Sequence, residues 1–147
     1  MTRTIRRTAL VAVALVAVTL SFAITPHAVN AQAVPLPDAP VLLRSGQFFN
    51  AGETGNGTAL LYRLADGTHL LRLEDFRVDF GPDLRVQFTS AADGSVLDIG
   101  GLRANRGNQD YALPATFDPD RYDATRIHCR FFRIVMIVAP LAGGTGY

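Results

Sequence analysis

The sequence has one cysteine, no tryptophan and no lysine in 147 residues. A single cysteine, Cys129, cannot form a disulfide within the chain. Three catalytic or binding motifs are missing: the Cys-x-x-Cys-His motif of covalent haem attachment, a phosphate-binding glycine loop and the Gly-x-Ser-x-Gly motif of serine hydrolases. We attribute the lack of lysine to genomic base composition. These absences point away from a conventional enzyme.

Residues 1–33 have the features of a cleaved secretory signal. Three arginines near the start precede an apolar run, residues 9–24, that is shorter than a membrane span. Small residues follow, and cleavage after Ala31 or after Ala33 fits the pattern equally well. The adjacent Arg6–Arg7 leave both the general secretory route and the twin-arginine route open. We expect an exported protein (extracellular, periplasmic or in the cell envelope) with no stable membrane span after cleavage.

The basic character of the chain belongs to this signal. It contains three of the fourteen arginines and none of the thirteen acidic residues. Its removal changes the formal net charge from +1 to about −2. A protein with this balance has no excess of cations to neutralise a row of phosphates. We therefore expect no nucleic acid partner.

The remainder of the chain is predicted to form one all-β domain. Residues 34–42 hold three prolines and are predicted to form an extended tether, residues 43–142 the domain, and residues 143–147 a short tail. Turn signals recur about every 8–15 residues, which is typical of antiparallel strands in a sandwich. Asp66–Gly67 is the clearest hairpin turn. We expect an antiparallel β-sandwich, or a flattened barrel, of about seven to nine strands.

Alternation of apolar and polar residues predicts which side chains face the core. Three inward-facing sets are expected: Leu84, Val86 and Phe88; Phe76, Val78 and Phe80; and Ile127, Cys129 and Phe131.

Cys129 is the most informative candidate site residue. Three interpretations stay open: a buried structural thiol, a redox-active or metal-ligating thiolate, and an intermolecular disulfide. His128 and His69 are the other candidate metal ligands. Because neighbouring strand residues point to opposite faces, His128 and Cys129 cannot bind one ion from a regular strand, although a bulge would remove that restriction. Whether His69 lies near Cys129 is not readable from the sequence.

Several segments in order resemble the DM-thirteen domain family. The resemblance covers about residues 43–142 and rests on these segments: Leu71–Phe76, Gly81–Val86, Leu97–Leu102, Gly107–Pro114, Tyr122, Ile127–Phe132 and Ala139–Leu141. The combination of Gly-Pro-Asp-Leu-x-Val, Gly-x-Gln-x-Tyr-x-x-Pro and a cysteine before phenylalanine is more specific than any single piece.

The resemblance implies an extracellular β-domain with a role in electron transfer. Such domains stand beside cytochrome-like DOMON domains in animal proteins and alone in bacterial exported proteins. The implied redox residue corresponds to Cys129, acting as a thiol or as a ligand to haem or a metal ion. Family members often have tryptophan just before this cysteine, whereas this chain has His128.

Two functions of different classes are therefore expected. The first is an exported redox module that works through Cys129 with a redox partner. The second is a non-catalytic binding or adhesion module of the cell envelope in which Cys129 is a buried structural residue.

Overall fold

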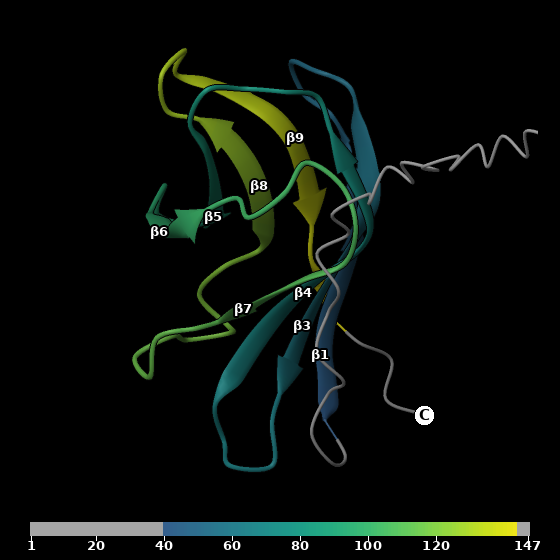
Figure 1. The fold of residues 1–147 in the computed structure, drawn as a ribbon. Helices are drawn as coiled ribbons and strands as arrows, with labels where there is room; N and C mark the ends of the chain where they lie inside the picture. Colours follow the sequence, from purple (N-terminus) through teal and green to yellow (C-terminus); the bar gives the residue numbers. More distant parts are fainter. Residues whose placement is uncertain (1–39, 144–147) are drawn as a thin grey trace, which may run out of the picture.

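The computed structural model describes residues 40–143, which form a β-structure without helices (Figure 1). Within this part of the chain, no helix is long and apolar enough to cross a membrane. The strands are β1 (Val41–Gln47), β2 (Phe49–Asn50), β3 (Gly55–Arg63), β4 (His69–Val78), β5 (Leu84–Thr89), β6 (Val96–Gly101), β7 (Gln109–Ala112), β8 (Ala124–Cys129), β9 (Ile134–Pro140) and β10 (Ala142–Gly143).

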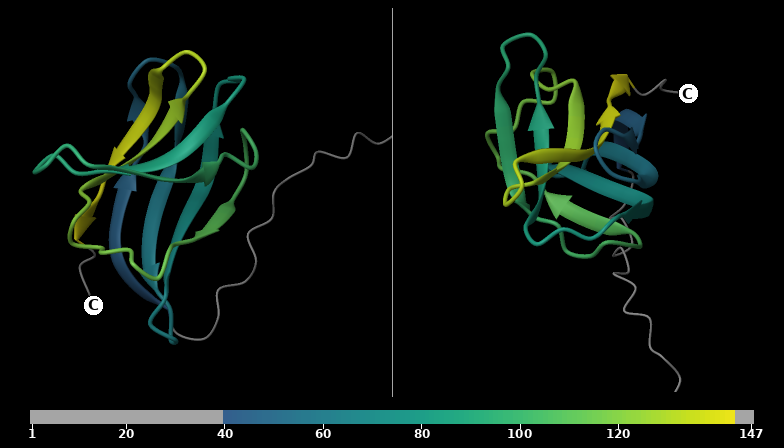
Figure 2. Two further views of the ribbon diagram at one scale, coloured as in Figure 1. Left: turned by 90° about the vertical axis from the view of Figure 1, so that its left-hand side faces the viewer. Right: turned by 90° about the horizontal axis from the view of Figure 1, so that it is seen from above.

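Two antiparallel sheets face each other across a common core (Figure 2). The first has the order β10-β1-β3-β4-β7 and the second the order β2-β9-β8-β5-β6. The expected antiparallel β-sandwich is therefore confirmed. Two of its ten strands, β2 and β10, contain only two residues each, so the main strands number eight.

The sandwich is closed along one side because the chain changes sheets there twice. β1 belongs to the first sheet and β2 to the second, and only Phe48 lies between them. β9 and β10 make the reverse change around Leu141. Both side chains at the crossings are buried in the core. This side of the fold is therefore closed like a barrel, whereas β6 and β7 form the open edges of the two sheets.

The predicted hairpin at Asp66–Gly67 connects β3 and β4. The Leu64 N–H donates to the Thr68 carbonyl oxygen at 2.8 Å, and the Asp66 carboxylate accepts from the Thr68 N–H and hydroxyl. Gly67 has φ +83°, a conformation that glycine adopts without strain.

The expected inward-facing residues of β5 are buried, with Leu84 7% exposed and Val86 and Phe88 0% exposed. Two expectations were wrong. Phe80 is 84% exposed because β4 ends at Val78, and Phe131 is 71% exposed because β8 ends at Cys129. Alternation holds only while the backbone stays extended, and both phenylalanines lie in turns beyond their strands.

The predicted signal, residues 1–33, and residues 144–147 of the predicted tail lie outside the described residues. Most of the predicted tether does as well. β1 begins at Val41, two residues before the expected start of the domain, and β10 includes Gly143.

Candidate functional site

Cys129 ends β8 and is completely buried, at 0% exposure. It pairs with Leu84 of β5 on one side and with Ile134 of β9 on the other. Its thiol therefore lies on the inner face of the second sheet. The turn from β8 to β9, which begins after Cys129, lies at one end of the sandwich (Figure 1).

The turn from Gly81 to Asp83 covers this thiol. A Cβ atom added to Gly81 would lie 3.5 Å from the Cys129 Sγ and 2.5 Å from the Leu84 Cδ2. The Arg130 N–H donates to the Asp83 carbonyl oxygen at 2.9 Å, and the Arg130 guanidinium binds the Asp83 carboxylate at 2.6 Å. The turn is thus tied to the residue that follows the cysteine.

A shallow hollow of about 250 Å³ adjoins the same turn. Gly81 and Leu84 line it together with Leu102 and Asn105 of the β6–β7 connection. Gly81 therefore lies both next to the Cys129 thiol and in the lining of this hollow. A side chain at Gly81 would crowd both Leu84 and the sulfur.

His128 lies on the opposite face of the second sheet. Its neighbours there are Arg85 across the β5 pairing, Asp98 of β6 and Arg126 of β8, while its β9 partner is the apolar Val135. The His128 Nδ1 atom is buried and has no hydrogen-bond partner. Burial lowers the pKa of His128, Arg126 lowers it further, and Asp98 opposes the shift. The ring is therefore held neutral near neutral pH.

The polar side chains around His128 are linked across three strands. Arg85 binds Asp98 at 3.0 Å, the Gln87 amide donates to Asp98 at 3.2 Å, and the Arg126 guanidinium donates to the Gln87 side chain at 3.0 Å.

His69 begins β4 in the first sheet, and its ring packs against Phe117 with centroids 5.6 Å apart. Phe117 packs on Phe88, which pairs with Thr125 at the other end of β8 from Cys129. Cys129 follows Thr125 by four positions along the extended strand, a distance of roughly 13 Å. The candidate ligands Cys129, His128 and His69 are therefore not brought together.

The donor set around Cys129 does not resemble a metal or haem pocket. Within residues 40–143, no three His, Cys, Asp or Glu side chains converge in a way that could hold a metal ion. The strand partners of Cys129 are Leu84 and Ile134, and Gly81 lies beside its sulfur. None of these three neighbours has a side chain that could bind a metal ion.

The motif around Gln109 and Tyr111 proves to be a buried polar network. The Tyr111 hydroxyl donates to the Gln109 Oε1 at 2.8 Å and accepts from the Arg103 N–H at 3.0 Å. Gln109 also exchanges two hydrogen bonds with the Ala104 backbone, at 2.7 and 3.1 Å. These bonds hold the β6–β7 connection against the core, so this motif serves the fold.

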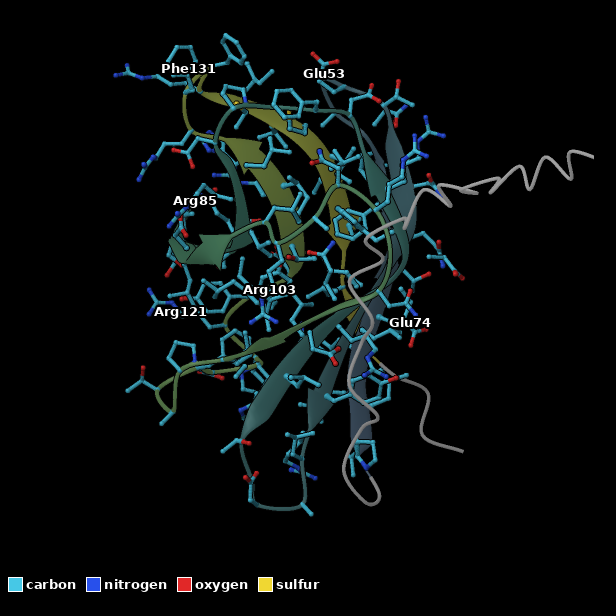
Figure 3. All side chains as sticks on the ribbon, viewed as in Figure 1. Glu53, Glu74, Arg85, Arg103, Arg121 and Phe131 are labelled. Atoms are coloured by element: carbon cyan, nitrogen blue, oxygen red, sulfur yellow. The ribbon has the colours of Figure 1, made fainter. Side chains whose placement is uncertain are left out.

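An exposed aromatic turn lies beside Cys129, and the strand alternation did not predict it. Phe131 and Phe132 occupy the β8–β9 turn, 71% and 59% exposed, and Figure 3 shows Phe131 at the outermost point of that hairpin. The signal was present as two phenylalanines between Arg130 and Arg133. The alternation of β8 was continued from Cys129 to Phe131, although the strand ends at Cys129, so Phe131 was expected in the core.

Fold and site together define an all-β sandwich domain with a single, fully buried cysteine at the end of a core strand. Residues 47–141 match the family described as electron transfer DM13. The chain belongs to this family, as the resemblance over residues 43–142 implied. No curated protein and no solved structure matches the chain.

Proposed function

We propose that this protein is an exported electron-transfer domain in which the Cys129 thiol is the redox-active group. Membership of the electron transfer DM13 family supports a redox role. The observation that carries the assignment to Cys129 is its position: the chain's one cysteine lies beside Gly81, which also lines a hollow at the surface.

The chemistry that fits the surroundings is that of a thiol. With no second cysteine in the chain, the partner must supply a disulfide. In exchange with a partner disulfide, the Cys129 thiolate attacks one sulfur, an Sγ–S bond forms, and the other partner sulfur leaves as a thiolate. Because Cys129 is fully buried, the step requires the surrounding structure to open, and the Gly81–Asp83 turn next to the sulfur is the segment that we expect to move.

The first experiment titrates the thiol in the folded protein with an aromatic disulfide reagent. We expect Cys129 to react faster than the protein unfolds, and Cys129→Ser to remove the signal. Gly81→Ala adds a methyl group next to the sulfur, so we expect the reaction to slow several-fold. Gly143→Ala is the matched control, because nothing lies within 4 Å of its new methyl group.

Two results would contradict the proposal. One is a thiol that reacts only at the rate of global unfolding. The other is a Gly81→Ala reaction that accelerates in step with lost stability, because the reagent would then reach the thiol through unfolding rather than through the turn.

A separate experiment tests whether Cys129 acts instead as a ligand to haem or a metal ion. Ultraviolet-visible spectra and metal analysis are compared for wild type and Cys129→Ala, both exported through the native leader. A visible band or bound metal that is lost in the variant would make Cys129 a ligand and replace the thiol mechanism.

The second candidate is a non-catalytic binding module with a structural cysteine. The complete burial of Cys129 and the exposure of Phe80, Phe131 and Phe132 favour it. An inert thiol in colourless, metal-free protein would make this candidate the better explanation.

A further inference from the structure

The β8–β9 hairpin ends in an exposed turn, Arg130–Arg133, that we call the aromatic tip. Its Phe131 and Phe132 rings contact each other edge to face, with centroids 5.0 Å apart, and neither ring is covered by the rest of the domain. Phe80, 84% exposed, lies in the neighbouring β4–β5 turn, which is bonded to Arg130 through Asp83. Phenylalanines this exposed in one place mark an interaction surface.

The backbone of the aromatic tip keeps the two rings outside. Cys129 and Ile134 pair across the end of the hairpin, so the four residues between them form the whole turn. Arg133 closes it with φ +56°, in the left-handed region that costs a residue with a side chain roughly 1 kcal/mol. With its ends fixed by the strand pairing, the turn cannot fold its rings back onto the core.

The charge around the aromatic tip is positive on one side. Arg126 lies on the outer face of the second sheet below it. Arg85 lies on the same face, and on the same side of the molecule as Phe131 in Figure 3, but its charge is balanced by the ion pair with Asp98. Arg126 bonds to an amide rather than a carboxylate. Arg133 makes no ion pair with any residue of the described chain. Arg130 is ion-paired with Asp83, so the positive excess around the tip comes from Arg126 and Arg133. This local excess is present although the chain beyond residue 33 contains more acidic residues than arginines.

We propose that the aromatic tip docks on the surface of a membrane that contains anionic phospholipids. Aromatic rings at a convex end enter the headgroup region, while flanking guanidinium groups bind lipid phosphates. The tip projects outward, and neither Phe131 nor Phe132 lines the hollow beside Gly81, so the rings are placed to meet a surface rather than to hold a peptide segment. This inference does not depend on the redox role of Cys129.

A second copy of the chain is a poorer occupant. Pairing two tips would bring the unpaired Arg133 side chains together, and like charges oppose such a contact. A four-residue turn also provides far less area than the roughly 1,000 Å² that a specific interface needs.

The experiment uses protein recovered after export through its own leader, mixed with phosphatidylcholine vesicles with and without phosphatidylglycerol. We expect binding that needs the anionic lipid and weakens with added salt. Phe131→Ser/Arg133→Gln should lower the partition coefficient roughly tenfold or more. The matched control is Val41→Ser/Arg63→Gln, which removes an exposed apolar side chain and an arginine that pair across β1 and β3 at the far end of the sandwich.

A fluorescence measurement reports insertion directly. Because the chain has no tryptophan, Phe131→Trp places the only indole in the aromatic tip. Its emission should shift to shorter wavelength with anionic vesicles and be quenched by lipids brominated in the acyl chains. Three results would overturn the proposal: equal binding by the tip and control variants, an unshifted emission, or a blue shift that needs only a higher protein concentration, which would indicate self-association.

Discussion

Adjacent residues in this chain differ sharply in environment, as His128 and Cys129 illustrate. Cys129 faces the core, whereas His128 faces Arg85, Arg126 and Asp98 on the outside of the same sheet. A strand without a bulge between them sends neighbouring side chains in opposite directions. The bulge in the pairing of β8 lies on the β9 side, at Met136, and does not turn His128 inward.

Stability is predicted to fall on acidification through His128. The folded protein holds the His128 proton less tightly than the unfolded chain does, because burial and Arg126 lower its pKa. The neutral ring therefore contributes stability that is present above the usual value of about 6.5 and is lost as the pH falls through the lower folded pKa.

Urea denaturation of wild type and His128→Gln between neutral and mildly acidic pH measures this effect. We expect the wild type to lose more stability than the variant, and His69→Gln to retain the wild-type decrease. Equal pH dependence in wild type and His128→Gln would show that His128 is not the group responsible.

At the scale of elements, the β6–β7 connection links the open edges of the two sheets. β7 is short, with four residues, and its position depends on Gln109 and Tyr111 as well as on its pairing with β4. Arg72 of β4 and Asp110 of β7 add a two-point ion pair, at 2.7 and 2.8 Å. Side-chain bonds thus hold an edge that strand pairing alone would hold weakly.

Tyr111→Phe is predicted to destabilise the protein by about 1 kcal/mol, because the Arg103 N–H and the Gln109 Oε1 each lose a partner in a partly buried network. Chemical denaturation measures the cost. Tyr62→Phe is the control, since its hydroxyl makes no hydrogen bond within residues 40–143 and its loss should change stability little. Equal effects of the two substitutions would contradict the assigned role of the network.

At the scale of the whole molecule, the closed side of the sandwich depends on close contact between β1 and β9. A Cβ atom on Gly46 would lie 2.9 Å from the Pro140 carbonyl carbon and still closer to its oxygen. The chain changes sheets on both sides of this contact, at Phe48 and at Leu141. The two backbones can approach only because Gly46 has no side chain.

Gly46→Ala is predicted to cost about 3 kcal/mol, because a methyl group there must push two backbone segments apart. Thermal and urea denaturation measure the loss of stability. Gly101→Ala is the control, because its new methyl group would meet nothing closer than the Arg85 guanidinium at 3.9 Å. A loss at Gly46 no larger than that at Gly101 would mean that the sheets do not close as described.

The sequence by itself determined the fold class and the inward face of the regular strands. Leu84, Val86 and Phe88 could be placed because a two-residue period is a local property of extended backbone. The hairpin at Asp66–Gly67 could be placed because its turn chemistry is local as well. The family resemblance also came from the sequence, and the match over residues 47–141 confirms it.

Only the tertiary structure decided where the strands end and what meets across them. It exposed Phe80 and Phe131, separated His69 from Cys129, and set Gly81 over the thiol. None of these features has a local signature, because each depends on strands distant in the sequence that pair and pack side by side. The sequence shows which residue types are available for chemistry, while the packing of the two sheets decides which of them meet.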